Sequence, residues 1–329
     1  MHKTKITALI ILAVIALLLG GFLHYSKNAE TPVDDEPRVN TENPNVESVP
    51  EIEVESEPEI EVESEPEIEV EVEPEVIDLQ NLEDLINDYL TTNDIDTDLM
   101  GYKITDLVSN ETIGLNTEQE YIAASIYKLP IAMIYYDGID EGIYSYDDSI
   151  LYEDGMGEIG GPVYDYYYPG EYLELDYLLN VMIEQSDNTS AHMLYEILGG
   201  WESYREMALK YTNEPAYPQF YAWENYLTVE FTNDLLLHIY DNQNKYERLL
   251  IDMSNAQQDH YLNYNMNNTI PQKTGNNLRG VGAVGIMLEN HPYAISFLSH
   301  FDFWRAHEIM GEISEITYNF FIQQEKVFE

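Results

Sequence analysis

The sequence predicts an α+β fold in which an antiparallel sheet, built from both ends of one domain, packs against a block of helices. Segments with strand patterns lie near the two ends of that domain, over residues 99–115 and 280–299. Helical patterns fill the long stretch between them, and a further helical pattern over 305–323 closes the chain. Strands and helices that segregate in this way are typical of α+β domains rather than of repeated βαβ units.

The domain opens with a helix and a hairpin. Apolar residues at helical spacing predict a helix over 79–90. Alternating residues over 99–108, a turn at 109–111 and a second short run over 112–115 predict a hairpin.

The middle of the domain is mostly helical in pattern. Residues 123–136 predict a helix that starts near Ser125, because Pro130 is tolerated only in the first turns. Residues 173–198 predict two helices with a break at 186–188. The remaining elements are two shorter helices and two paired strands, over 231–240, 246–253, 280–288 and 293–299.

The N-terminus carries a candidate membrane anchor. Residues 6–23 form an apolar run, preceded by Lys3 and Lys5. Its length as a helix, roughly 27 Å, is close to a hydrocarbon core. A cleaved signal peptide is the alternative, but no small-residue cleavage pattern follows the run. We therefore expect residues 1–29 to be a single-pass anchor of the cell membrane with the rest of the chain extracytoplasmic, since basic flanks stay inside.

An acidic repeat follows the anchor. The octad Pro-Glu-Ile-Glu-Val-Glu-Ser-Glu starts at Pro50 and at Pro58, and a third copy at Pro66 carries Val72 instead of serine. The alternation also matches a strand, but like charges along one edge repel and proline recurs every eighth residue. We expect residues 30–76 to be a disordered spacer that holds the domain at 77–329 away from the membrane.

Composition excludes several classes of function. The formal net charge is −48, with 14 basic against 62 acidic residues, so the chain repels nucleic acid and anionic lipid. Contact with the membrane is expected through the N-terminal helix only. The absence of cysteine excludes disulfides, zinc–thiolate sites and a cysteine nucleophile. Because basic residues are scarce, each lysine kept in the domain requires a reason.

The first candidate motif is Ser125-Ile126-Tyr127-Lys128. Residues at i and i+3 share a helix face, so the lysine amine can reach the serine hydroxyl. A neutral lysine can take the proton of a serine nucleophile if burial or nearby positive charge lowers its pKa. The alternative is a surface lysine one turn from a helix-capping serine.

The second motif is Ser186-Asp187-Asn188, which interrupts a strongly apolar helical region. A polar turn between apolar helices needs internal hydrogen-bond partners. A simple helix cap by Ser186 or Asp187 is the alternative.

The third motif is Lys273-Thr274-Gly275, just before the strand pair. A strand edge at this point offers a cation, a hydroxyl and backbone donors to one ligand. The alternative is a turn with an incidental lysine.

In this order the three motifs resemble those of the active-site-serine penicillin-recognising enzymes, the class A β-lactamases and penicillin-binding proteins. The resemblance extends from about Leu99 onward, and further matching stretches are Ala123–Ser125, 184–191, Leu198–Gly200 and the glycine-rich strand after Lys273. It implies a β-lactamase-like fold and a serine hydrolase that acts on amide bonds, which the expected anchor would tether to the membrane.

The resemblance also implies residue roles. Ser125 would be the acylated nucleophile, Lys128 its proton acceptor, and Ser186 the relay to the leaving nitrogen. Asn188 would bind the substrate's side-chain amide. The substrate carboxylate would be held by the third motif, Lys273-Thr274-Gly275, and the oxyanion by the backbone N–H groups of Ser125 and Asn276.

The sequence differs from the class A pattern at the position of the deacylating base. Class A β-lactamases carry Glu-x-x-Leu-Asn between the second and third motifs. Here Glu224 and Leu227 match that pattern, but Thr228 replaces the asparagine and the loop is short. Glu224 is the tentative base, with Glu214 as a weaker candidate; a surface glutamate is the alternative.

We expect the substrate to be a small-molecule β-lactam or a D-alanyl stem peptide of peptidoglycan, and the chain to be a monomer. No cofactor or metal is expected, because we find no histidine paired with a carboxylate at i, i+4 spacing. The alternatives are a D,D-peptidase or penicillin-binding protein with slow deacylation, and a β-lactam sensor or wall-binding module without turnover.

Overall fold

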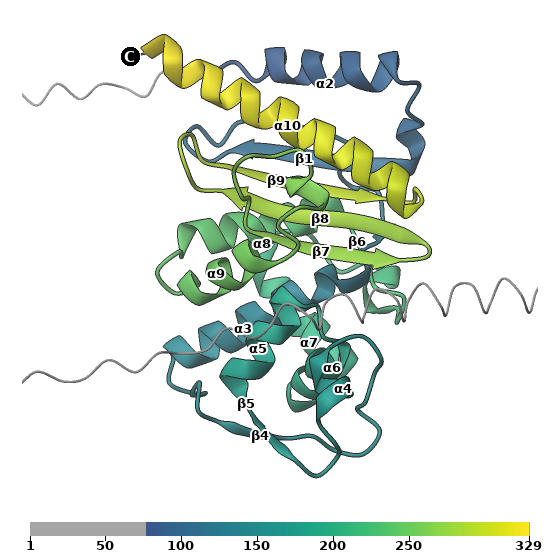
Figure 1. The fold of residues 1–329 in the computed structure, drawn as a ribbon, viewed down its shortest axis with the longest axis vertical. Coiled ribbons are helices and arrows are strands. Elements are labelled where there is room, and N and C mark those ends of the chain that lie inside the picture. The colour runs from purple at the N-terminus through teal and green to yellow at the C-terminus, as the bar shows by residue number, and fades with distance from the viewer. Residues whose placement is uncertain (1–76, 329) are drawn as a thin grey trace, which may run out of the picture. The chain divides into compact units, whose positions relative to one another are not determined.

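A five-stranded antiparallel sheet in the order β2-β1-β9-β8-β7 forms the upper part of the domain (Figure 1). The computed structural model describes residues 77–328, so the expected anchor (1–29) and spacer (30–76) lie outside it. The strands are β1 (Met100–Asp106), β2 (Thr112–Leu115), β7 (Gln272–Asn277), β8 (Gly280–Met287) and β9 (Tyr293–Ser299). The first and last parts of the domain thus share one sheet, which confirms the predicted α+β class.

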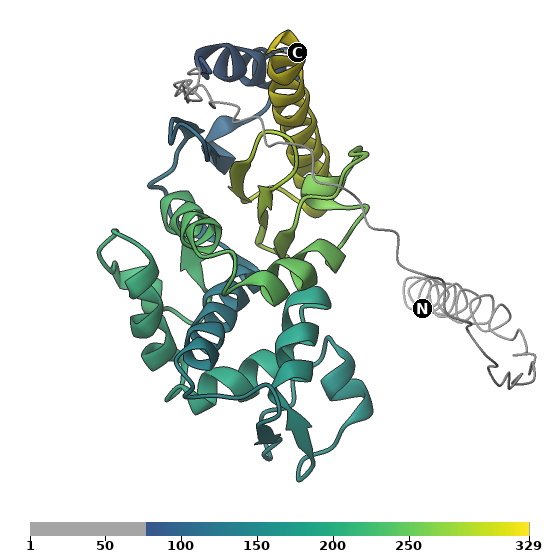
Figure 2. The same cartoon turned by 90° about the vertical axis from the view of Figure 1, so that its left-hand side faces the viewer.

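Two helices cover one face of the sheet, α2 (Gln80–Thr92) and α10 (Phe303–Phe328) (Figures 1 and 2). Leu82 and Ile86 of α2 and Ile309 of α10 are fully buried there with Ile104 and Ile295 of the sheet. Spacings of three and four residues place such side chains on one helix face, which explains the amphipathic pattern of α2. Within residues 77–328 no helix combines the length and apolar composition that a membrane span requires.

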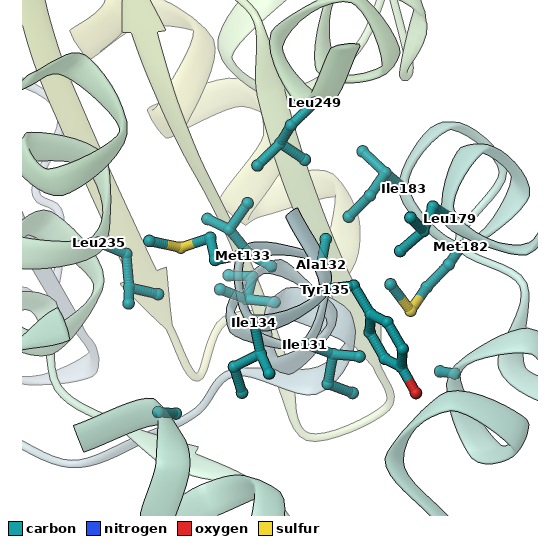
Figure 3. Packing of buried hydrophobic residues seen from close by; sticks show 14 of the residues in the cluster. Ile131, Ala132, Met133, Ile134, Tyr135, Leu179, Met182, Ile183, Leu235 and Leu249 are labelled. Carbon is teal, nitrogen blue, oxygen red and sulfur yellow. The ribbon is translucent and has the colours of Figure 1, made fainter. Parts of the chain in front are cut away.

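The other face of the sheet packs against the helical block, with α8 (Val229–Asp241) in contact with β1, β8 and β9. At the centre of the block lies α3 (Lys128–Asp140), whose residues 128–138 are all buried. A helix that is apolar all round is stable only when surrounded by protein. Figure 3 shows its side chains among those of α5 (Leu175–Glu184), α8 and α9 (Glu247–Asn255), namely Leu179, Met182, Ile183, Leu235 and Leu249.

The remaining elements of the described residues are short. The helices are α4 (Pro162–Tyr166), α6 (Asn188–Ile197) and α7 (Trp201–Ala208), with 3₁₀ turns η1 (Thr97–Leu99), η2 (Ala124–Tyr127), η3 (Leu209–Tyr211), η4 (Pro218–Tyr221) and η5 (Tyr261–Asn263). Two small antiparallel pairs join β3 (Tyr121–Ile122) to β6 (Tyr226–Leu227) and β4 (Ser149–Leu151) to β5 (Tyr172–Glu174).

The predicted helix over 123–136 needs a correction at its start. Ser125 lies in the 3₁₀ turn η2, and the α-helix begins only at Lys128. Ala124 adopts a left-handed φ of 44°, which an α-helix cannot continue through. The third motif was also misplaced, because Lys273-Thr274-Gly275 lies inside the edge strand β7 rather than before the strands. Its polar residues lack the apolar alternation that indicates a strand.

A buried carboxylate fixes the C-terminal half of α3. The side chain of Asp137 is 9% exposed and accepts two hydroxyl and two ammonium partners from η3 and from the two residues before α9. The donors are Lys210 (2.8 Å), Tyr211 (2.6 Å), Lys245 (3.1 Å) and Tyr246 (2.7 Å). Burial alone would raise the pKa of Asp137, but these hydrogen bonds hold it well below its usual range.

We expect Asp137→Asn to lower the free energy of unfolding by about 3 kcal/mol at pH 7, because two ammonium and two hydroxyl groups lose the charged acceptor that they share at this buried position. A carboxyl with a depressed folded pKa stabilises the fold above its unfolded pKa and loses that effect as the pH falls. The difference between variant and wild type should therefore shrink below about pH 4. Urea unfolding at several pH values measures it, and a pH-independent difference would contradict the assignment.

Candidate active site

A cleft of about 370 Å³ lies where η2, the loop before α4, and the N-terminal ends of α6 and α7 meet the end of β7. Its lining is mixed, with one serine, four asparagines, two glutamates and three aromatic side chains. The lining residues are Ala124, Ser125, Tyr127, Glu158, Asn188, Trp201, Trp223, Glu224, Asn225, Asn276 and Asn277. Residues of the first and second motifs, together with the two residues that follow the third motif, therefore meet at one hollow.

The first motif forms the floor of this cleft. In a 3₁₀ turn the side chains at i and i+3 eclipse each other, and Lys128 Nζ lies 3.2 Å from Ser125 Oγ. The lysine is fully buried. Its amine also contacts the carbonyl oxygen of Ser186 at 2.5 Å and Asn188 Oδ1 at 2.6 Å. A buried amine surrounded by oxygen acceptors is held in one position, aimed at the serine.

The second motif bridges two lysines. Ser186 adopts a left-handed φ of 57° in the break between α5 and α6. This conformation places its Oγ 3.3 Å from Lys128 Nζ and 3.1 Å from Lys273 Nζ. Asp187 caps α6, as the alternative interpretation of this motif predicted. Its carboxylate accepts the N–H groups of Ser190 and Val163, each at 2.7 Å. The motif therefore both caps α6 and supplies the site.

The third motif brings the sheet against the serine. Lys273 is buried in β7, where its Nζ also contacts the carbonyl oxygen of Thr274 at 2.9 Å. The next residue must be glycine, since a Cβ on Gly275 would lie 2.2 Å from the carbonyl oxygen of Ala123 and 3.2 Å from the backbone nitrogen of Ser125. The close approach of this strand places Asn276 at the cleft beside Ser125.

Burial controls the charge of both lysines. It lowers the pKa of Lys128 to about 7, although the charges of Asp187 and Glu158 act in the opposite direction. Burial and the nearby charge of Lys128 lower the pKa of Lys273 well below its ordinary value. A lysine with a pKa near neutrality can accept the proton of a serine hydroxyl.

Glu224 lies at the edge of the cleft. Its side chain is 56% exposed and pairs with Arg279 Nη1 at 3.1 Å, and among the described residues it has no hydrogen bond to Ser125 or Lys128. Glu214 lines a different hollow with Glu230 and Asp234 and accepts a hydrogen bond from Thr228. The deacylating role of Glu224 stays a prediction.

Sequence reasoning missed several cleft residues, of which Asn225 is the most firmly held. Buried at a left-handed φ of 56°, it donates from Nδ2 to the carbonyl oxygen of Ala124 at 2.5 Å. Its Oδ1 accepts from Nη1 of the fully buried Arg205 at 2.7 Å. The sequence offered one signal for this pair, the scarcity of basic residues. A buried arginine such as Arg205 needs a hydrogen-bond partner, and Asn225 supplies it.

The expectation that no metal binds was based on finding no histidine paired with a carboxylate at i, i+4 spacing, and that finding was wrong. His192 and Glu196 stand four residues apart on α6, and His192 Nε2 lies 3.8 Å from the Glu196 carboxylate. The Nδ1 atom lies 2.9 Å from Glu158. Among residues 77–328, however, no group of three histidine or carboxylate side chains is arranged to hold a metal ion.

The fold and the site together define a β-lactamase-like serine enzyme. The sequence pattern of the β-lactamase enzyme family matches residues 81–321, which is most of the chain, and the protein belongs to this family. One curated relative, β-lactamase VEB-1 of Pseudomonas aeruginosa, is 23% identical over 158 residues. That match covers 44% of this chain and 53% of VEB-1, so it spans about half the length of the relative.

Solved structures share the fold. PBP-A superposes with a TM-score of 0.64 at 21% identity, covering 74% of this chain and 97% of PBP-A. A β-lactamase from Sphaerobacter thermophilus gives a TM-score of 0.61 at 19% identity, covering 73% and 96%. The same architecture thus occurs both in a protein named as a β-lactamase and in PBP-A.

We expect Gly275→Ala to fold but to react with a fluorescent penicillin about 100-fold more slowly, because the new Cβ must push Ser125 out of position. Gly142→Ala is the control. The added Cβ there meets nothing within 4 Å, and its left-handed φ of 72° costs only about 1–2 kcal/mol of stability. Equal labelling of both variants would show that the close approach of β7 does not position the serine.

Proposed function

We propose that this protein forms an acyl-enzyme on Ser125 with β-lactams or with D-alanyl peptide-like substrates. The observation that carries the proposal is the buried amine of Lys128, 3.2 Å from Ser125 Oγ and lowered in pKa to about 7. An amine that is neutral at working pH and fixed beside a hydroxyl is the arrangement that activates a serine nucleophile.

Acylation follows from the hydrogen bonds of the cluster. Ser125 Oγ attacks the amide carbonyl carbon while its proton passes to Lys128 Nζ. The C–N bond then breaks, and the leaving nitrogen takes a proton from Ser186 Oγ, which is replenished by Lys128 at 3.3 Å. The products are an ester on Ser125 and a free amine, with the lysine neutral again.

Substrate binding is assigned to the groups around this centre. Lys273 and Thr274 bind the substrate carboxylate, and the N–H groups of Ser125 and Asn276 bind the oxyanion. Asn188 Oδ1 accepts from Lys128, and its second lone pair accepts from the substrate amide. One of the two hydrogens on its Nδ2 is donated to the carbonyl oxygen of Ile159 at 2.8 Å.

Deacylation separates the two candidate functions. A hydrolase requires a base that activates water, the role assigned to Glu224. The exposure of Glu224 and its ion pair with Arg279 favour the second candidate, a penicillin-binding protein with slow deacylation. PBP-A has been solved in variant form as an acyl-enzyme complex with penicillin G, so this fold can carry such an ester.

The proposal includes a location. The apolar run at 6–23 and the acidic repeat at 50–73 would tether a monomeric catalytic domain outside the cell membrane, within reach of peptidoglycan stem peptides. A β-lactam sensor or wall-binding module without turnover would share this arrangement.

The decisive assay follows a chromogenic cephalosporin on the full-length chain, with intact-protein mass spectrometry of the adduct. Wild type should acquire one adduct, and Ser125→Ala should acquire none. Steady turnover identifies a hydrolase, whereas a stoichiometric adduct identifies the penicillin-binding alternative. Hydrolysis that survives Ser125→Ala would overturn the mechanism, and deacylation that is unchanged in Glu224→Gln would move the base elsewhere.

The rate of acylation should rise about tenfold per pH unit up to about pH 7 and then level off, because only the neutral form of Lys128 accepts the proton. Stopped-flow labelling across pH 5–9 measures this rate. A rate that keeps rising toward pH 10, as for a solvated lysine, would contradict the role of burial.

A further inference from the structure

The cleft holds a second charged group beyond the serine–lysine cluster, the carboxylate of Glu158. Two hydrogen bonds fix its backbone to Thr189 of α6, from Glu158 N–H to the threonine Oγ1 at 2.9 Å and from that hydroxyl to Glu158 O at 3.0 Å. The following carbonyl groups, of Ile159 and Gly160, accept from Asn188 at 2.8 and 3.2 Å. The loop that carries Glu158 is therefore tied to the same asparagine that contacts Lys128.

The carboxylate itself is open to the cleft. Its side chain is 37% exposed, and among the described residues only the His192 ring pairs with it, through Oε1. Its charge reaches the catalytic centre, because it is one of the two carboxylates that oppose the lowered pKa of Lys128. Glu158 is thus a fixed negative charge on the wall beside the reacting serine.

Aromatic rings form another part of the lining. Trp223 is 65% exposed and lies 5.0 Å from the ring of Trp201, which in turn lies 5.2 Å from Tyr127. A cation beside a tryptophan ring is attracted by the electrons of its face. The described residues that line this cleft include no lysine or arginine; Lys128 lies beneath Ser125, and Arg279 pairs with Glu224 at the edge. The lining near Glu158 and the tryptophans therefore favours a positively charged substrate group. A negatively charged substrate group is favoured only beside Lys273.

We infer that the cleft selects substrates whose acyl side chain carries an ammonium group, which Glu158 recognises beside the tryptophans. This inference rests on the proposed acylation of Ser125 and defines its substrate class. The substrate would be zwitterionic, with its carboxylate toward Lys273 and its ammonium toward Glu158. Such a molecule also avoids the repulsion that a chain of net charge −48 exerts on a purely anionic ligand.

Three penicillins that differ only at the α-carbon of the side chain test the inference. Benzylpenicillin carries hydrogen there, ampicillin an ammonium and carbenicillin a carboxylate. Acylation rates of the full-length chain are measured at about pH 7, where an α-ammonium is still mostly protonated. The rate for benzylpenicillin serves as the internal reference in each variant, so any effect of Glu158 on Lys128 cancels in the ratio.

In Glu158→Gln the ratio of ampicillin to benzylpenicillin should fall about threefold, and the ratio of carbenicillin to benzylpenicillin should rise by a similar factor. Glu153→Gln is the control, because Glu153 is an exposed glutamate five residues earlier that does not line the cleft; it should keep both ratios. Unchanged ratios in Glu158→Gln, with all three penicillins still reacting, would overturn this inference alone. Failure of every penicillin to acylate the wild type would overturn the proposed function and this inference with it.

Discussion

The structure depends on one buried amine. Lys128 Nζ is removed from water and surrounded by oxygens of Ser125, Ser186 and Asn188 at 2.5–3.3 Å. A charged ammonium in such a place is costly unless it is well paired, and burial therefore favours the neutral amine. Burial raises the free energy of the charged ammonium, and the same effect lowers the pKa of Lys128 so that its neutral amine can act as a base. The hydrogen bonds of the second motif hold this amine in place.

The scaffold carries local strain to achieve this. Ala124, Ser186 and Asn225 all adopt left-handed φ angles within contact of the cluster, and such conformations cost of order 1–3 kcal/mol each. They persist because surrounding contacts leave no alternative, including the approach of β7 at Gly275 and the hydrogen bonds of Asn225. Rigid elements on either side, the packed α3 and the sheet edge, set the geometry before a substrate arrives.

The sequence was informative where periodicity or spacing carries the signal. The helix and strand order followed from apolar patterns, and the three motifs located the serine and both lysines of the cluster. The 3₁₀ turn at Ser125 was not predictable, because it is set by a strand about 150 residues later in the chain. Glu158 and Trp223 lie on irregular loops fixed by tertiary contacts, and no local pattern distinguishes such residues from ordinary surface side chains. The membrane anchor and the spacer expected before residue 77 stay predictions.

The most direct test of the account is the titration of Lys128 itself. The chain has few lysines, so NMR of lysine labelled with ¹³C at Cε gives a simple spectrum, and Lys128→Arg identifies the resonance by its loss. We predict a midpoint near pH 7 for this resonance. A midpoint near 10.4, the value of a solvated lysine, would contradict the claim that burial prepares this amine to activate the serine.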